Sequence, residues 1–188
     1  MPNQQKQVLV PVAQGTEEME AITIIDVLRR AGANVIVASV DDINIKASGG
    51  IEFKANRLIK DCMDEQFDLI VLPGGIPGAH NLRDSKELEI LLKKQAEQQK
   101  YYGAICASPA VVLHHYGLVT PGKVTCHPGF VDQIDNGNIV ESNVVVDGNC
   151  ITSRGAGTAC DFALNLVELL YSTEKKNQVS YGLALPVD

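Results

Sequence analysis

The sequence predicts one α/β domain in which a mostly parallel β-sheet is covered by helices on both faces. Short apolar runs typical of buried strands alternate with stretches of helical periodicity. Where a helix joins two such strands, it carries the chain back across the sheet and makes the strands parallel. The length of 188 residues suits one full-sized core and is short for two. We therefore expect a flavodoxin-like three-layer sandwich with a small β-hairpin, and residues 1–188 as a single domain.

The first unit of the chain is predicted to be a strand, a helix and a second strand. Residues 8–13 form one buried apolar run and residues 34–40 form the next. Thr16 is expected to cap the helix between them, and Gly32 is expected to end it. The core face of this helix is expected at Ile22, Ile25 and Leu28.

A β-hairpin off the main sheet is expected in the irregular segment 41–56. Residues 43–46 and 51–54 alternate apolar and polar side chains, and Ser48-Gly49-Gly50 supplies a turn between them.

The later elements continue the alternation of strands and helices. Asp147-Gly148 lies between two short apolar runs, which is a strong signal for a hairpin turn. The further predicted strands are 67–72, 101–105, 143–146 and 150–152, and the further predicted helices are 85–99, 107–116 and 158–170.

The bulk composition is that of an ordinary soluble globular protein. Apolar residues make up 45% and charged residues 21% of the chain. The net charge of −7 and the pI of about 5.1 give no support for binding to nucleic acid or to an anionic membrane. No stretch approaches the roughly 20 apolar residues that cross a bilayer, and residues 1–7 are too polar for a secretory signal. We therefore expect a cytoplasmic protein.

Five cysteines are spread widely along the chain, at positions 62, 106, 126, 150 and 160. The odd count, the wide spacing and the lack of a Cys-x-x-Cys pair argue against a disulfide framework and against a structural zinc site. No cluster of His, Cys, Asp and Glu has the spacing of metal ligands, so we expect no metal.

Cys106 is the sharpest candidate for chemistry. In an open parallel sheet, ligands bind beyond the C-terminal ends of the strands, and residues 15–20, 73–75 and 104–108 fall at such ends. A helix that begins just after Cys106 would favour the thiolate and lower the cysteine pKa. The N–H groups of Ala107 and Gly75 could then stabilise an oxyanion. The alternative is that Cys106 is a small buried apolar residue and that Gly74-Gly75 only makes a turn.

Acidic residues and a histidine could assist a thiolate. A carboxyl beside Cys106 would have a raised pKa and could carry protons. Spacing does not choose among Glu17, Glu18 and Glu20, since any of them could simply complement the helix dipole. His127 could be a base near Cys106 or a turn residue bonded to the backbone.

A glycine-rich segment precedes the predicted last helix. Gly155-Ala156-Gly157 could cradle a phosphate at the N-terminus of that helix. It lacks the Lys-Ser/Thr of a P-loop, which makes it a weak phosphate signal.

Taken together, the motifs resemble the ThiJ/PfpI superfamily, whose domain is of the class I glutamine amidotransferase type. The resemblance is strongest to the branch of the parkinsonism-associated deglycase and its bacterial and plant relatives. It covers nearly the whole chain, apart from the segment 41–62, which matches poorly. The matching segments are Gly-Thr-Glu-Glu-Met-Glu at 15–20, Asp-Val-Leu-Arg-Arg-Ala-Gly at 26–32, Leu-Pro-Gly-Gly at 72–75, Ala-Ile-Cys-Ala at 104–107, Thr-Ser-Arg-Gly at 152–155 and Gly-Thr at 157–158.

The resemblance implies a role for each matching residue. Cys106 corresponds to the reactive cysteine of the family and Glu20 to its partner glutamate. The remaining correspondences are the oxyanion-hole amides at Gly75 and Ala107, the pocket histidine at His127, and, at Arg30, an arginine that crosses a homodimer interface. Ala107 stands where the peptidase branch has histidine, so a Cys-His peptidase is not supported. Cys62 is not assigned the role of the family's extra redox-active cysteine.

The resemblance implies an enzyme that acts on small reactive carbonyls. The expected activity is that of a glutathione-independent glyoxalase, a lyase of the glyoxalase III type that converts methylglyoxal to lactate, or of a deglycase, a hydrolase that acts on glycated amines. Cys106 would form a hemithioacetal and Glu20 would move its protons, with no metal or organic cofactor. The alternative is an oxidative-stress sensor or chaperone that acts through oxidation of Cys106.

Overall fold

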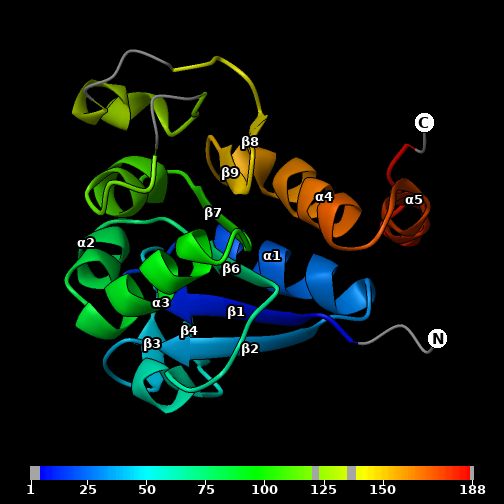
Figure 1. The fold of residues 1–188 in the computed structure, drawn as a ribbon. Coiled ribbons are helices and arrows are strands. Elements are labelled where there is room, and N and C mark those ends of the chain that lie inside the picture. Colours follow the sequence, from blue (N-terminus) through cyan, green and yellow to red (C-terminus); the bar gives the residue numbers. More distant parts are fainter. Residues whose placement is uncertain (1–4, 120–122, 135–138, 187–188) are drawn as a thin grey trace.

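The computed structural model describes residues 5–119, 123–134 and 139–186 and contains a seven-stranded sheet (Figure 1). The strand order is β5-β2-β1-β6-β7-β9-β8, and every neighbouring pair is parallel except β8 and β9. The mostly parallel sheet is therefore confirmed. The polar N-terminal residues 1–4 lie outside the described residues. The strands are β1 (Gln7–Val12), β2 (Asn34–Ser39), β5 (Arg57–Leu58), β6 (Leu69–Leu72), β7 (Tyr101–Ile105), β8 (Val144–Asp147) and β9 (Cys150–Ser153).

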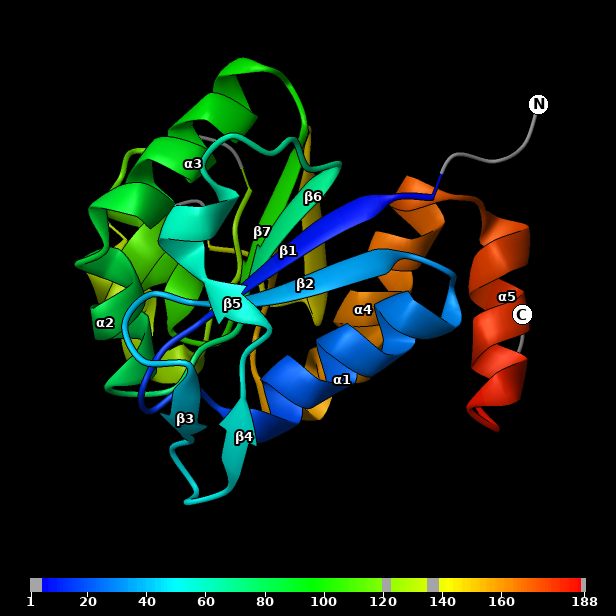
Figure 2. The same ribbon diagram turned by 90° about the horizontal axis from the view of Figure 1, so that it is seen from below.

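Helices cover both faces of this sheet, as the three-layer prediction requires. One hydrophobic cluster joins the sheet to α1 and α4, with Phe162 of α4 fully buried in it, and a second joins the other face to α2 and α3. Figure 2 shows these two pairs of helices on opposite sides of the sheet. Within the described ranges, no helix combines the length and apolar character needed to cross a membrane. The α-helices are α1 (Glu18–Arg30), α2 (Gly78–Arg83), α3 (Lys86–Glu97), α4 (Ala159–Leu170) and α5 (Thr173–Gly182).

The predicted hairpin off the main sheet is confirmed. Strands β3 (Asn44–Lys46) and β4 (Glu52–Lys54) pair antiparallel in a sheet of their own. The Glu18 carboxylate accepts hydrogen bonds from Gly49 N–H at 2.9 Å and from the Ser48 hydroxyl at 3.2 Å. The hairpin turn is therefore attached to the first turn of α1.

Two expectations about α1 were wrong. Its N-cap is Glu17, whose Oε2 accepts from Glu20 N–H at 2.7 Å, whereas the Thr16 hydroxyl accepts from Ala13 N–H inside the preceding turn. Ile22 is 49% exposed instead of facing the core. Its position is one residue, about 100° of helix rotation, away from the buried stripe. The buried apolar positions of α1 are Ala21, Ile24, Ile25, Val27 and Leu28.

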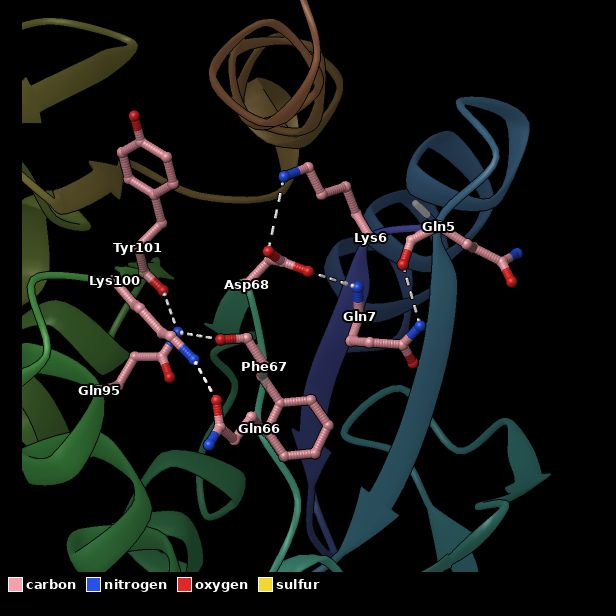
Figure 3. A network of polar contacts seen from close by, with 9 residues as sticks. All are labelled: Gln5, Lys6, Gln7, Gln66, Phe67, Asp68, Gln95, Lys100 and Tyr101. Atoms are coloured by element: carbon pink, nitrogen blue, oxygen red, sulfur yellow. Dashed lines mark hydrogen bonds and ion pairs between the residues drawn. The ribbon is translucent and has the colours of Figure 1, made fainter. Parts of the chain in front are cut away.

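A polar network closes the sheet at the N-terminal ends of its strands (Figure 3). The Gln95 amide donates to the carbonyls of Phe67, just before β6, and Tyr101, in β7, at 3.1 and 2.9 Å. The Asp68 carboxylate accepts from Gln7 N–H at 2.8 Å and pairs with Lys6 at 3.5 Å. These contacts hold β1, β6 and β7 together at the N-terminal ends of the strands. The candidate site lies at the opposite edge of the sheet, at the C-terminal ends of the same strands.

Candidate active site

Cys106 follows the last residue of β7 and begins the turn into a short π-helix, Pro109–His114. Its φ of +66° lies in the left-handed region, where residues other than glycine are uncommon. Cys106 N–H donates to the carbonyl of Ser153 at 3.1 Å, and its own carbonyl accepts from His127 N–H at 2.8 Å. The backbone of Cys106 is thus held between β9 and the segment of His127, and its half-buried thiol stands at the C-terminal end of the sheet.

Glu20 places its carboxyl against this thiol from the first turn of α1. The side chain is fully buried, and its Oε2 accepts from Gly74 N–H at 2.7 Å. Oε1 is also buried, and among the described residues it has no hydrogen-bond partner. Burial raises the pKa of this carboxyl to about 7, although the hydrogen bonds from Gly74 and Cys106 oppose the rise. Glu20, rather than Glu17 or Glu18, is therefore the acid that contacts Cys106.

The thiol differs from the sequence expectation of a lowered pKa. Burial, followed by the charge and hydrogen bonding of ionised Glu20, raises the pKa of Cys106 to about 12. Hydrogen bonds from Gly75 and Ala107 N–H lower it, but they are outweighed. Two of the three causes of the rise come from the negative charge of Glu20. A proton on that carboxyl removes them, so the thiolate is favoured when Glu20 holds the proton.

The Pro73-Gly74-Gly75 turn directs the Gly75 N–H to the sulfur and the Gly74 N–H to the Glu20 carboxyl. Gly75 has a φ of +91°, and a Cβ there would lie 2.5 Å from the Glu17 nitrogen and 2.6 Å from the Gly15 oxygen. A Cβ on Gly74 would lie 2.6 Å from Cys106 Cβ. Both positions require glycine for close approach. The N–H groups of Gly75 and Ala107 converge at the sulfur, which is the arrangement that an oxyanion hole needs.

The His127 ring lies on the same side of Gly155 as the Glu20 carboxyl. The ring is exposed, and Nδ1 accepts from Gly129 N–H at 3.1 Å, which places the ring proton on Nε2. A Cβ built on Gly155 would lie 3.6 Å from His127 Cδ2 and 4.0 Å from Glu20 Oε1. The imidazole and the carboxyl therefore flank one gap, and both sequence interpretations of His127, as a turn residue and as a pocket residue, fit this position.

Arg30 is not brought to this site by its own chain. It lies at the C-terminal end of α1, ten residues or about 15 Å of helix from Glu20. Its guanidinium pairs with Asp26 at 2.6 Å and is partly exposed. Any contact between Arg30 and a Cys106 pocket would need a second copy of the chain.

Sequence reasoning missed Ser108 and the Thr158 network. The buried Ser108 hydroxyl donates to the Pro73 carbonyl at 2.6 Å and ties the cysteine turn to the glycine turn. The Thr158 hydroxyl accepts from Gly155 N–H at 3.2 Å, so this amide is already hydrogen-bonded and is not available to a phosphate. The sequence shows Ser108 and Thr158 but does not show their hydrogen-bond partners. The partner of Ser108 is 35 residues away, and the partner of Thr158 lies in an irregular loop.

Metal ligands do not gather in the described part of the chain. No group of three or more His, Cys, Asp or Glu side chains in residues 5–119, 123–134 and 139–186 is arranged to hold an ion.

Known proteins match this chain over almost its full length. A model of the DJ-1/PfpI family matches residues 6–169. Protein DJ-1 homolog B of Arabidopsis thaliana is 48% identical over 93% of this chain, and glutathione-independent glyoxalase DJR-1.2 of Caenorhabditis elegans is 38% identical over 95% of each chain. This chain spans only 40% and 47% of two Arabidopsis relatives. The structure of oxidized Toxoplasma gondii DJ-1 has a TM-score of 0.94 at 45% identity, and the match covers 96% of this chain and 98% of that one.

Proposed function

The chain belongs to the DJ-1/PfpI family, and from this premise we propose that it is a cysteine-dependent enzyme that detoxifies reactive carbonyls without glutathione. The proposed reaction is the conversion of methylglyoxal to lactate. The observation that carries the proposal is the buried Glu20 carboxyl in contact with the Cys106 thiol, with two backbone N–H groups converging on the same sulfur. A relative whose printed name is a glutathione-independent glyoxalase supports it.

The geometry suits an isomerisation on the sulfur. The Cys106 thiolate adds to the aldehyde carbon, and the N–H groups of Gly75 and Ala107 donate to the resulting oxyanion, which takes a proton to give a hemithioacetal. Glu20 removes the proton from that carbon and returns it to the neighbouring carbonyl carbon, and the hydroxyl proton of the hemithioacetal passes to the oxygen of that neighbouring carbon. These two proton shifts convert the hemithioacetal into a thioester of lactate. Water then cleaves the thioester and restores the thiol. The sum is methylglyoxal plus water giving lactic acid, with no external oxidant or reductant.

Two related roles use the same residues. Deglycase activity would release the early adduct of an aldehyde with an amine, and we keep it as a hydrolase activity of this pocket. A redox-sensing role is the alternative from another class, because a thiol beside a carboxyl that can donate a hydrogen bond to sulfinate oxygens is suited to oxidation. We also infer a single domain and a cytoplasmic location, neither of which is needed for the chemistry.

The test of the proposed function is lactate formation from methylglyoxal by the wild-type chain in buffer free of glutathione. We expect lactate to accumulate over many turnovers and to equal the aldehyde consumed. Loss of aldehyde without lactate, or a single equivalent of aldehyde bound per thiol, would rule out the glyoxalase and favour the sensor. Release of free amine from a preformed adduct in the presence of an aldehyde scavenger tests the deglycase separately.

A second copy of the chain would complete the pocket. Met19 and Ile22 are 60% and 49% exposed on α1, and exposed large apolar side chains that lie together on a helix favour an interface. We propose a homodimer in which α1 is at the interface and the Arg30 of one chain approaches His127 of the other. Asp26 would hold the guanidinium until the partner is bound.

Arg30→Ala is expected to weaken substrate handling more than folding. Its partly exposed pair with Asp26 is worth only a few tenths of a kcal/mol at the surface, so the melting temperature should change little. The KM for methylglyoxal should rise several-fold, since a donor at the pocket is lost. Light scattering on dilute wild-type protein should give the mass of a dimer. Arg29→Ala, which changes the adjacent exposed arginine, is the control, and a fully active monomer would end the proposal.

A further inference from the structure

Gly155 leaves a gap beside the unpartnered oxygen of Glu20. The residue is buried, yet, apart from its neighbours in the chain, a Cβ built on it would meet only two described atoms within 4 Å, His127 Cδ2 at 3.6 Å and Glu20 Oε1 at 4.0 Å. Both distances are ordinary van der Waals contacts. A methyl group would therefore fit this gap and touch both the imidazole and the carboxyl.

The backbone of Gly155 does not itself need glycine. Its φ of 164° and ψ of −169° are extended values that any residue adopts. Gly75 differs, because there a positive φ and a clash with backbone atoms both exclude a side chain. At position 155 the conformation and the contacts permit alanine, so the consequence of glycine at this position is that no side chain from it lies against Glu20 Oε1 and the His127 ring.

The loop that carries Gly155 is held in place by its neighbours. The Thr158 hydroxyl accepts from Gly155 N–H at 3.2 Å and lies 3.0 Å from the Gly155 carbonyl, which also accepts from Thr158 N–H at 2.8 Å. The Thr158 hydroxyl contacts the Ser153 hydroxyl at 2.7 Å, and Ser153 donates to the Asn143 carbonyl at 2.6 Å. These hydrogen bonds restrain the backbone of the loop. A methyl group added to Gly155 would therefore stay beside Glu20 and His127, because the loop could not move away.

We propose that Gly155 determines the substrate specificity of the carbonyl site: because this residue has no side chain, the substituent on the substrate's second carbonyl can pack against its backbone, beside Glu20 and His127. An alanine at position 155 would obstruct this substituent, which in methylglyoxal is a methyl group. In the wild type this methyl group would lie beside Glu20 Oε1, the oxygen free to move the proton between the two carbons. This inference rests on the proposed function and names the subsite by which the pocket distinguishes a methyl-bearing dicarbonyl from glyoxal.

The test is Gly155→Ala, assayed with glyoxal and methylglyoxal. The ratio of kcat/KM for methylglyoxal to that for glyoxal should fall by about 10- to 200-fold, the range that one methyl or methylene group commands in a pocket. Gly157→Ala is the matched control, since it lies in the same loop and a Cβ there meets nothing within 4 Å. It should leave the ratio unchanged. An unchanged ratio in Gly155→Ala, or an equal fall in Gly157→Ala, would overturn the proposal.

A second measurement separates this inference from the proposed function. Alkylation of Cys106 by chloroacetaldehyde and by its methyl ketone homologue, chloroacetone, is followed by peptide mass spectrometry and needs no turnover. Gly155→Ala should slow alkylation by chloroacetone more than alkylation by chloroacetaldehyde, relative to wild type. If wild type makes no lactate but this selectivity appears, the subsite stands and the glyoxalase does not. If lactate forms but neither ratio moves, the subsite is wrong and the glyoxalase stands.

Discussion

Cys106→Ala is expected to abolish lactate formation from methylglyoxal. The proposed reaction forms a covalent bond to this sulfur in its first step, and no other described thiol lies against Glu20. Enzymes that lose a covalent nucleophile lose on the order of 10⁶-fold in kcat. The variant should show only the uncatalysed background. The measurement is lactate production at saturating methylglyoxal, with melting temperature recorded on the same sample.

Matched variants separate the chemistry of Cys106 from its effect on folding. Cys106 has a φ of +66°, a conformation that costs a residue with a Cβ about 1–2 kcal/mol. Cys106→Gly should therefore be as inactive as Cys106→Ala and at least as stable. Cys160→Ala, at a half-buried thiol in the first turn of α4, should keep full activity. Appreciable turnover by Cys106→Gly, or loss of turnover in Cys160→Ala alone, would contradict the assignment.

The sequence was sufficient to predict the sheet and the position of Cys106 at its C-terminal edge. Apolar runs located the strands, since β7 coincides with the predicted 101–105 and β8 and β9 form the expected hairpin. The turn of that hairpin is Gly148-Asn149, one residue later than predicted, because Asp147 is the last residue of β8 and pairs with Cys150. The rule that ligands bind beyond the C-terminal strand ends then selected Cys106 and Gly75. The strands and the positions of Cys106 and Gly75 could be predicted from sequence because they depend on local patterns and on one general property of parallel sheets.

What the sequence could not provide depends on contacts between distant segments. The choice of Glu20 over its neighbours needed the direction of α1 relative to Gly74, 54 residues away. Helix α5 has almost no amphipathic pattern to detect, and α2 has only six residues. The error on the thiol pKa has the same origin, because burial and the charge of Glu20 outweigh the effects of the local turn.

Glu20→Gln is expected to reduce turnover of methylglyoxal by about 10²- to 10⁴-fold, the usual loss when a general acid–base group is removed. Glutamine keeps the size of the side chain and can still accept from Gly74 N–H, but it cannot take a proton from carbon. Glu17→Gln and Glu18→Gln are the comparison variants. Neither removes a group in contact with Cys106, so both should retain activity, although Glu18→Gln loosens the β3–β4 turn. Near wild-type kinetics in Glu20→Gln would remove the residue from the mechanism.

The same substitution should make the protein more stable at alkaline pH, and this excludes unfolding as the cause of the lost activity. The Glu20 carboxyl has a folded pKa of about 7, above its ordinary value of 4.5, so the folded state binds this proton more tightly than the unfolded state. The wild type therefore loses stability as the pH rises from about 4.5 through about 7, by at most about 3.5 kcal/mol at roughly 1.4 kcal/mol per unit. Glutamine does not titrate.

The unfolding free energy of Glu20→Gln minus that of wild type should be smallest at pH 4 and should increase to a plateau above pH 7, as measured by urea denaturation across that range. A difference in unfolding free energy that does not change with pH, or that falls as the pH rises, would mean that the Glu20 carboxyl does not have a raised pKa in the folded protein.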